Sequence, residues 1–406
     1  MADTPNIRIE GFEDDWVEKQ LGDLYIERNE RGNDSLQILS VSIHSGVSDG
    51  ELDEDGLGKV VRRSEDKSTY KHVYPGDLIF NMMRAWQGAI GVAKIEGMIS
   101  PAYISAVPND EVYPPFMDYL LRRKEVIDQI NNLSYGVTDF RKRLYWDSFV
   151  KMKCFFPSVE EQKKIVHVLE ELDKNISHQE KEVVGLKKLK QYLLQKMFPR
   201  DGEQVPEIRF EGYSDEWEER KISDIAEIVG GGTPDTNNPA YWDGEIDWYS
   251  PAEMEGLRYA NSSVRKITEL GLQKSSAKVL PAHKTVLFTS RAGIGKMAIL
   301  QRPAATNQGF QSLIVNDETD PYFIYSMEHR IKKMAESIAS GSTFLEISGK
   351  MLGNLVVMLP TLKEQKEIAT FFRGVDDLII LHQRKCDALK NLKAYLLQNM
   401  FPKEEG

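Results

Sequence analysis

The sequence predicts an α+β fold in tandem duplication, in which a globular region is followed by a long helix and this arrangement is then repeated. Two observations predict it. The helix-patterned segment 160–199 returns as segment 363–402 at a constant offset of 203 residues. The segments that precede the globular regions also match, since IRIEGFEDDWVEKQLGDL at 7–24 corresponds to IRFEGYSDEWEERKISDI at 208–225. A period near 200 residues is too long for a solenoid, so each repeat is a domain with its own helix.

Each repeated segment carries a mainly apolar seam whose positions alternate between steps of four and three. In the first segment the seam runs through Ile165, Leu169, Leu172, Ile176, Gln179, Val183, Leu186, Lys190, Leu193 and Met197. In the second it runs through Ile368, Phe372, Val375, Ile379, His382, Cys386, Leu389, Lys393, Leu396 and Met400. Such a sustained heptad seam is typical of a coiled coil. Polar residues interrupt both seams at the same places, and they are expected to fix the register at a cost in stability.

Helices of this length reach roughly 60 Å at ~1.5 Å per residue, and neither can bury its apolar stripe alone. One interpretation is a generic dimerisation coiled coil between two chains. Two in-register copies in one chain favour the other interpretation, an intramolecular antiparallel coiled coil with pseudo-twofold symmetry. Each helix is expected to begin at a capping box, formed by Ser158 with Glu161 and by Thr361 with Glu364.

The globular regions resemble each other at their edges. Segments 74–93 and 280–299 both place a proline before a short apolar strand, then an arginine and a glycine-containing turn. This alignment matches Arg84 with Arg291. We expect mixed α+β structure in both regions, with a helix over residues 116–131 of the first.

The interiors of the two regions differ. Residues 32–71 are polar and acidic, whereas the corresponding part of the second region begins GGGTPDTNNPAYWDGEIDWYSP at residue 230 and is rich in aromatic residues. The division suggests a shared framework that carries two different recognition surfaces. The predicted domains are 1–156 (first globular domain), 157–199 (first helix), 200–359 (second globular domain) and 360–406 (second helix).

Composition narrows the function classes. The net charge of −11 argues mildly against nucleic acid as the sole partner, although basic residues cluster locally around 62–71 and 141–153. Two cysteines cannot form a disulfide framework or a zinc site. No apolar run is long enough for a bilayer and no secretory signal is visible at the first residues, so we expect a cytoplasmic protein without a membrane partner.

Several short motifs do not extend into catalytic sites. GIGK at 293–296 is not a phosphate-binding loop, because Met297 replaces the required serine or threonine. NPAY at 238–241 has alanine where an amino-methyltransferase has a second proline, and no glycine loop for a methyl donor appears. The Pro-Asp pair at 234–235 has no downstream nuclease strand, and the histidines lack zinc-ligand spacing. We therefore expect a protein that is not an enzyme.

The order of the remaining motifs resembles that of the specificity subunit of a type I restriction–modification enzyme. The motifs are Pro-x-x-x-Glu-Gln at 157–162 and 360–365, GGTP at 231–234, the Tyr-Trp…Gly…Ile…Trp series at 241–248, TNQG at 306–309 and GSTF at 341–344. No single motif is very specific, but their order, repeated twice, covers essentially the whole chain. The first globular region departs from the pattern, because it lacks the GGTP series.

The resemblance implies that each globular region is a target-recognition domain for one half of a bipartite, asymmetric site in double-stranded DNA. It implies that the paired helices set the spacing and dock two methyltransferase (M) subunits, with restriction (R) subunits joining the full complex. It also implies that this chain holds no cofactor, and that S-adenosylmethionine, ATP and Mg²⁺ are used by the partner subunits.

Candidate site residues follow from the basic clusters and from the motifs. For DNA we expect Arg62, Arg63, Lys71, Arg84, Arg141, Lys142, Thr233, Thr289, Ser290, Arg291, Lys296 and Gln308. For the partner subunits we expect, on the helices, Glu161, Gln162, Lys190, Glu364, Gln365 and Lys393. Phosphate and base-edge contacts suit the first group. The alternative is that the two aligned arginines pair with carboxylates, and that the basic clusters are solvated surface.

Two alternative functions stay open from the sequence. One is a DNA-recognition subunit whose partner combines methylation and cleavage in one polypeptide. The other is a coiled-coil scaffold that does not bind DNA, which the acidic charge favours and which predicts no DNA retention even with a partner present.

Overall fold

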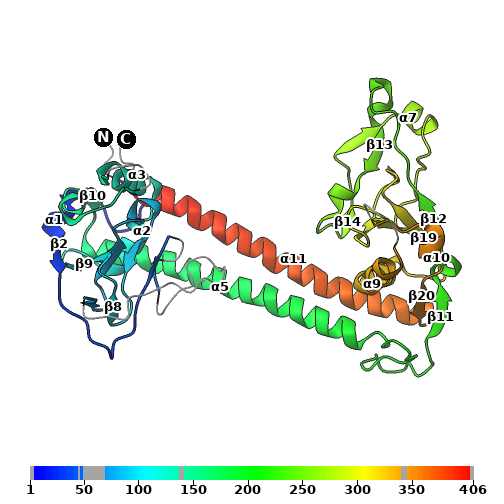
Figure 1. Cartoon of the computed structure of the whole chain (residues 1–406), viewed down its shortest axis with the longest axis horizontal. Helices are drawn as coiled ribbons and strands as arrows, with labels where there is room; N and C mark the ends of the chain where they lie inside the picture. Colours follow the sequence, from blue (N-terminus) through cyan, green and yellow to red (C-terminus); the bar gives the residue numbers. More distant parts are fainter. Residues whose placement is uncertain (1–3, 44–45, 49–68, 137–140, 340–344, 403–406) are drawn as a thin grey trace. The chain divides into compact units, whose positions relative to one another are not determined.

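The computed structural model describes residues 4–43, 46–48, 69–136, 141–339 and 345–402 (Figure 1). The chain divides into two compact units, one formed by Met1–Glu180 with Arg384–Gly406 and the other by Lys181–Gln383. Each unit therefore contains one globular domain and portions of both long helices.

The first unit contains an antiparallel sheet with the strand order β2-β9-β6-β7. Its strands are β2 (Tyr25–Arg28), β9 (Tyr103–Pro108), β6 (Leu78–Asn81) and β7 (Ile90–Val92). Smaller ladders join β1 (Val17–Gln20) to β10 (Lys153–Phe156), β3 (Val41–Ser42) to β4 (Gly46–Val47) and β5 (Lys71–Val73) to β8 (Gly97–Ile99). The helices are α1 (Leu21–Leu24), η1 (Ala85–Gln87), α2 (Pro114–Leu120), α3 (Lys124–Leu133), α4 (Trp146–Phe149) and the start of α5 (Val159–Lys196).

The second unit contains a sheet with the order β12-β19-β16-β17-β14. Its strands are β12 (Ala226–Gly230), β19 (Gln311–Val315), β16 (Thr285–Phe288), β17 (Met297–Leu300) and β14 (Tyr259–Ala260). A further sheet has the order β15-β13-β18, with β15 (Arg265–Ile267), β13 (Trp242–Tyr249) and β18 (Ala304–Thr306), and β11 (Glu218–Lys221) pairs with β20 (Val356–Leu359). The helices are α6 (Ile222–Ile225), η3 (Pro239–Tyr241), η4 (Pro251–Met254), α7 (Glu269–Gln273), α8 (Pro321–Ser326), α9 (Glu328–Ile338), α10 (Gly349–Gly353) and the start of α11 (Leu362–Asn399).

The two domains repeat one topology. The order β12-β19-β16-β17 corresponds strand by strand to β2-β9-β6-β7, and the ladder β11–β20 corresponds to β1–β10. The sequence prediction of duplicated α+β domains is confirmed. The sheet β15-β13-β18 and strand β14 belong to the second domain, in the part of the chain where the two sequences diverge.

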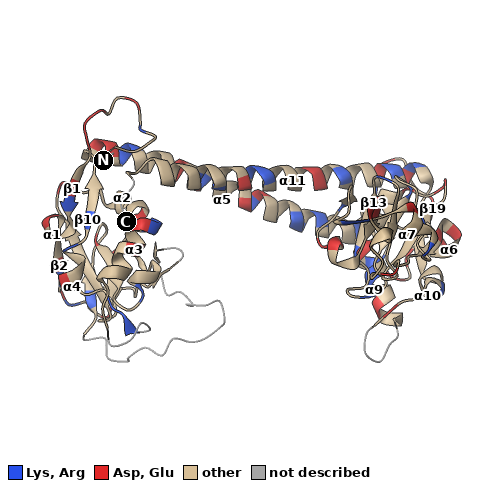
Figure 2. Ribbon diagram, turned by 90° about the horizontal axis from the view of Figure 1, so that it is seen from above, with Lys and Arg blue, Asp and Glu red and all other residues tan. Residues whose placement is uncertain are grey.

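The long helices run antiparallel within each unit. In the first unit, Lys393 pairs with Asp173 and Lys390 pairs with Glu180 at 2.7 Å, so rising residue numbers in α5 meet falling numbers in α11. In the second unit, Lys190 pairs with Asp376. Many seam positions are buried, including Leu169, Phe372 and Cys386. Figure 2 shows acidic and basic residues at intervals along both helices.

Two local predictions need correction. Residues 116–131 form two helices, because Arg123 is extended (φ −69°, ψ 147°) and points its buried guanidinium at the Pro402 carbonyl, 3.1 Å away. The predicted capping boxes form only by half. The Ser158 and Thr361 hydroxyls accept from the backbone N–H groups of Glu161 and Glu364, but both carboxylates bind arginines instead.

Candidate nucleic-acid interface

The GGTP segment of the second domain is fixed by two tryptophans. The Trp248 Nε1–H donates to the Gly232 carbonyl at 2.9 Å, and the Trp242 Nε1–H donates to the Asp235 carbonyl at 3.1 Å. The Gly232 N–H donates to the Thr306 carbonyl, and the Thr233 hydroxyl bonds to the Gln308 side chain. Motifs far apart in the sequence therefore form one continuous loop surface.

Glycine is required where these loops cross. A Cβ at Gly231 would lie 2.0 Å from the Asn307 carbonyl oxygen, and one at Gly232 would lie 2.3 Å from the Ser276 hydroxyl. The backbones can approach this closely only without side chains. The close approach presents the predicted DNA contacts Thr233, which is partly exposed, and Gln308, which is exposed, on one surface.

Arg265, on edge strand β15, completes this surface and was missed in the sequence analysis. Its guanidinium carbon lies 3.5 Å from the centre of the Trp242 ring and 5.9 Å from that of Trp248. The two indoles meet edge to face, with ring centroids 5.1 Å apart. The pairing of β13 with β15 brings the arginine over the aromatic pair, and short-range sequence spacing does not reveal this.

The β16–β17 hairpin carries four predicted DNA contacts, and the structure buries two of them. The Thr289 hydroxyl donates to the Gly293 carbonyl at 2.6 Å, and the Ser290 side chain is fully buried. Neither hydroxyl can reach a ligand. Arg291 is partly exposed, and Lys296 pairs with Glu255. Of these four, Arg291 is the one whose charge faces solvent without an ion-pair partner among the described residues.

The equivalent hairpin of the first domain brings together more of the predicted contacts. Arg84 is exposed between β6 and β7. The Leu144 N–H donates to the Met82 carbonyl at 2.9 Å, so the hairpin loop lies against the segment that carries Arg141 and Lys142. Arg141 is exposed and Lys142 is partly exposed. The hairpin and this segment are therefore adjacent on the first domain, and both carry predicted DNA contacts.

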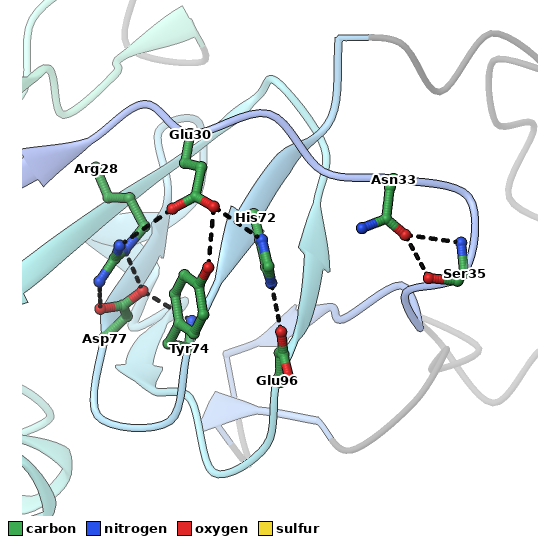
Figure 3. A network of polar contacts seen from close by, with 8 residues as sticks. All are labelled: Arg28, Glu30, Asn33, Ser35, His72, Tyr74, Asp77 and Glu96. Carbon is green, nitrogen blue, oxygen red and sulfur yellow. Dashed lines mark hydrogen bonds and ion pairs between the residues drawn. The ribbon is translucent and has the colours of Figure 1, made fainter.

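Lys71 precedes His72, which belongs to a network of polar contacts that contains the carboxylates of Glu30, Asp77 and Glu96 (Figure 3). Its ammonium lies 3.7 Å from the Glu27 carboxylate. The neighbouring His72 ring lies between Glu30 and Glu96, at 3.2 and 2.8 Å. Such a site does not favour a phosphate at Lys71. Arg62 and Arg63 lie outside the described residues.

The same network ties two strands together. Arg28 binds Asp77 through two nitrogen atoms, at 2.7 and 3.1 Å, and its guanidinium lies 4.6 Å from the Tyr74 ring centre. The Tyr74 hydroxyl donates to Glu30 at 2.9 Å, which raises the pKa of the phenol and lowers that of the carboxyl. The network is therefore structural, with its cations already paired.

The predicted partner contacts at the helix starts are buried within the chain. Arg8 binds Glu161 through two bonds of 2.9 Å, and Arg209 binds Glu364 through two bonds of 2.8 Å. Both carboxylates are 1% exposed. The arginines belong to the repeated IRxEG segments. Each segment therefore binds the start of a long helix, α5 or α11, through an arginine–glutamate ion pair.

The glutamines beside them serve the globular domains. The Gln162 side chain accepts from the Tyr113 N–H at 2.8 Å and donates to the Glu111 carbonyl at 3.0 Å. Gln365 accepts from the Asp320 N–H at 3.0 Å in the same way. The side chains of this Glu-Gln pair in each copy are therefore buried within the chain, and they offer no exposed surface for the predicted partner contact.

The seam lysines bind carboxylates on the opposite helix. In the second unit, the Lys190 ammonium lies 2.7 and 2.8 Å from the Asp376 oxygens, and the Tyr322 hydroxyl donates to the same carboxylate at 2.8 Å. Burial raises the pKa of Tyr322, so its hydroxyl keeps the proton that it donates. The cluster joins both long helices to the globular domain.

The first unit repeats this cluster, but its tyrosine lies four residues further along its helix. Lys393 pairs with Asp173, and the Tyr119 hydroxyl donates to that carboxylate at 3.0 Å. Tyr119 is the sixth residue of α2, whereas Tyr322 is the second residue of α8. Four residues are about one helical turn, so both hydroxyls come from the same helix face. The constant sequence offset could have identified the aspartates, but it could not assign their partners.

Among the described residues, no group of three or more His, Cys, Asp or Glu side chains could hold a metal ion. No helix in the described part of the chain is long and apolar enough to cross a bilayer. Cys154 and Cys386 are both buried, and they form no disulfide.

Comparison with known proteins gives consistent results. Residues 214–391 match the family model described as the type I restriction modification DNA specificity domain. The type I restriction enzyme MjaIX specificity subunit of Methanocaldococcus jannaschii is 36% identical over 191 residues, which are 46% of this chain and 44% of that protein. The putative type I restriction enzyme MjaX specificity subunit of the same organism is 22% identical over 95% of this chain and 92% of its own length.

A solved structure shows the same fold over nearly the whole chain. The S subunit of a type I restriction–modification system from M. genitalium superposes with a TM-score of 0.59 at 14% identity, covering 99% of this chain and 100% of that one. The first of the two relatives is matched over less than half of its length, whereas the second is matched over 92% of its length and the solved structure over 100%.

Proposed function

We propose that this chain is the specificity subunit of a type I restriction–modification system and that it selects the DNA sequence on which the system acts. Residues 214–391 match the DNA specificity domain of such systems, and a putative specificity subunit matches nearly the whole chain. Each globular domain binds one half of a bipartite, asymmetric site in double-stranded DNA. The paired helices set the spacing between the half-sites and dock two methyltransferase subunits, which restriction subunits join.

One observation carries this proposal. The two domains share the strand order β2-β9-β6-β7 and its counterpart, while the second adds the sheet β15-β13-β18 and the tryptophan-bound GGTP loop. A common framework with different loop surfaces suits the recognition of two different base sequences in related positions. The half-sites should therefore differ in sequence.

We assign the chemistry to the partner subunits. S-adenosylmethionine for methylation, and ATP with Mg²⁺ for cleavage, would be bound there. The present chain contributes sequence selection and positioning. The match to a DNA specificity domain argues against the alternative of a scaffold that does not bind DNA.

Exposed apolar residues on the helices offer a better docking surface than the buried Glu-Gln pairs. Leu189 is 47% exposed and Tyr192 is 50% exposed, and their counterparts Leu392 and Tyr395 are 45% and 55% exposed. These positions stand at the repeat offset, so the chain presents the same apolar pair twice. Two copies of one partner would use two such equivalent patches, and apolar contact would stabilise their binding.

Co-expression with a separately encoded methyltransferase subunit tests the whole proposal. Methylome sequencing should show a split motif, and exchange of residues 208–359 for those of another family member should change one half of it. A change in both halves would contradict the assignment of one domain to one half-site.

Docking is tested with glutamates. Leu189→Glu combined with Leu392→Glu should abolish co-purification of the methyltransferase, whereas Leu270→Glu, at a leucine that is 44% exposed on α7, should not. Retained co-purification of the double variant would refute the docking surface and leave the DNA proposal standing.

A further inference from the structure

We propose that Arg265 recognises a guanine in the half-site bound by the second domain, and that Trp242 holds its guanidinium in the orientation that this contact needs. The inference rests on the proposed function and adds to it a specificity-determining residue and the base that it recognises. Arg265 carries no such assignment from the motifs.

The first argument is position. Arg265 lies on edge strand β15 and its side chain is exposed. It stacks on the residue whose indole fixes the Asp235 carbonyl, directly after the GGTP segment that bears Thr233. The guanidinium thus belongs to the same surface as the bonded pair Thr233 and Gln308.

The second argument is preorganisation. Trp242 is 6% exposed, and its ring is held by its own hydrogen bond and by the edge-to-face contact with Trp248. A guanidinium 3.5 Å from the centre of a fixed ring has a defined plane, and the cation–π attraction maintains it. A ligand that binds there need not order a flexible side chain, which increases affinity.

The third argument is that the donors of Arg265 are unused. Four other arginines of the second unit use their N–H groups within the chain: Arg209 on Glu364, Arg220 on Glu218, Arg258 on Asp377 and Arg330 on the Pro199 carbonyl. Among the described residues, Arg265 has no hydrogen bond or ion pair through its guanidinium. A stacked and exposed guanidinium with unused donors is arranged for an external acceptor.

Guanine suits this geometry better than a phosphate does. The O6 and N7 atoms of guanine form a planar pair of acceptors in the major groove, and the arginine fork matches both at once. A phosphate accepts from any direction and is bound well by a mobile lysine, so it makes no use of a fixed plane. Fixing the plane of Arg265 therefore favours base recognition.

The test uses the assembled complex with its methyltransferase partner and the split DNA site found for the wild-type chain. Arg265→Ala and Arg265→Lys are compared with Arg220→Ala, which removes one exposed positive charge elsewhere in the same unit. Far-UV circular dichroism checks that each variant is folded. The readouts are the methylated motif, the affinity for every single-base substitution and the slope of affinity against salt.

Both Arg265 variants should lose about ten- to hundredfold in discrimination at one guanine of one half-site, since lysine keeps the charge without the fork. Replacement of that guanine by 7-deazaguanine should weaken wild-type binding and leave Arg265→Ala unaffected. Arg220→Ala should keep the full motif.

An unchanged motif in both Arg265 variants overturns the inference. A uniform loss over all sequences, with a smaller salt slope and rescue by lysine, also overturns it, because that pattern identifies a phosphate contact. If the wild-type complex shows no sequence preference at all, the proposed function fails and the inference fails with it.

Discussion

Replacement of Asp376 by alanine should destabilise the second unit by about 2–4 kcal/mol, because this carboxylate joins both long helices to the globular domain. It accepts the Lys190 ammonium at 2.7 and 2.8 Å and the Tyr322 hydroxyl at 2.8 Å. A hydrogen bond to a charged group contributes about 1.5–3 kcal/mol. We take the lower part of that range for the lysine, whose side chain is 22% exposed and can still reach water after the substitution.

The adjacent Asp377 provides a matched control. Its side chain is 59% exposed and binds Arg258 at the surface, so Asp377→Ala should cost less than about 1 kcal/mol. Urea unfolding followed by far-UV circular dichroism and tryptophan emission measures both. Since a chain of two units can unfold in two steps, Asp173→Ala identifies the transition of the first unit. Equal losses for Asp376→Ala and Asp377→Ala would refute the structural role of the cluster.

Two further predictions concern buried charges. Arg209→Ala should lower the free energy of unfolding by about 2–4 kcal/mol, because it leaves the 1%-exposed Glu364 carboxylate without its partner. The surface control Arg220→Ala should lower it by less than about 1 kcal/mol. Similar losses for the two variants would show that the ion pair at the start of α11 adds no stability. Burial raises the pKa of the Glu328 carboxyl, so the folded state binds this proton more tightly than the unfolded state does. The resulting stabilisation is complete below the pKa of an unfolded glutamate, about 4.3, and it is lost as pH rises through the folded pKa. Glu328→Gln keeps an acceptor for the Met297 N–H but does not titrate. The urea midpoint of this variant should therefore rise relative to that of the wild type from about pH 4 upward, and the difference should become constant above the folded pKa. A difference that does not vary with pH would contradict this prediction.

The sequence predicted contacts between distant segments where the duplication repeats the same pattern. The seam positions of Lys190 and Lys393 predicted polar groups that fix helix register, and the structure supplies an aspartate for each. The antiparallel pairing followed from two stripes that neither helix could bury alone. What the repeat could not supply was the choice of partner, since the capping glutamates bind distant arginines rather than their own helix starts.

Surface chemistry was harder to predict. Thr289 and Ser290 look like ligands because they are polar and follow a strand, but the hairpin turns both hydroxyls into the domain. Arg265 looks like ordinary surface charge until β13 and β15 pair and place it over Trp242. Exposure and stacking arise from tertiary packing, and a local sequence pattern does not contain them.

The one-turn displacement between Tyr119 and Tyr322 bears on how one globular domain could be exchanged for another. The aspartate and lysine of each cluster lie on the long helices, whereas the tyrosine lies on a helix of the globular domain. Since tyrosines on either of two successive helical turns make this contact, a globular domain exchanged for another needs a tyrosine on only one of these turns to bind the long helices in the same way.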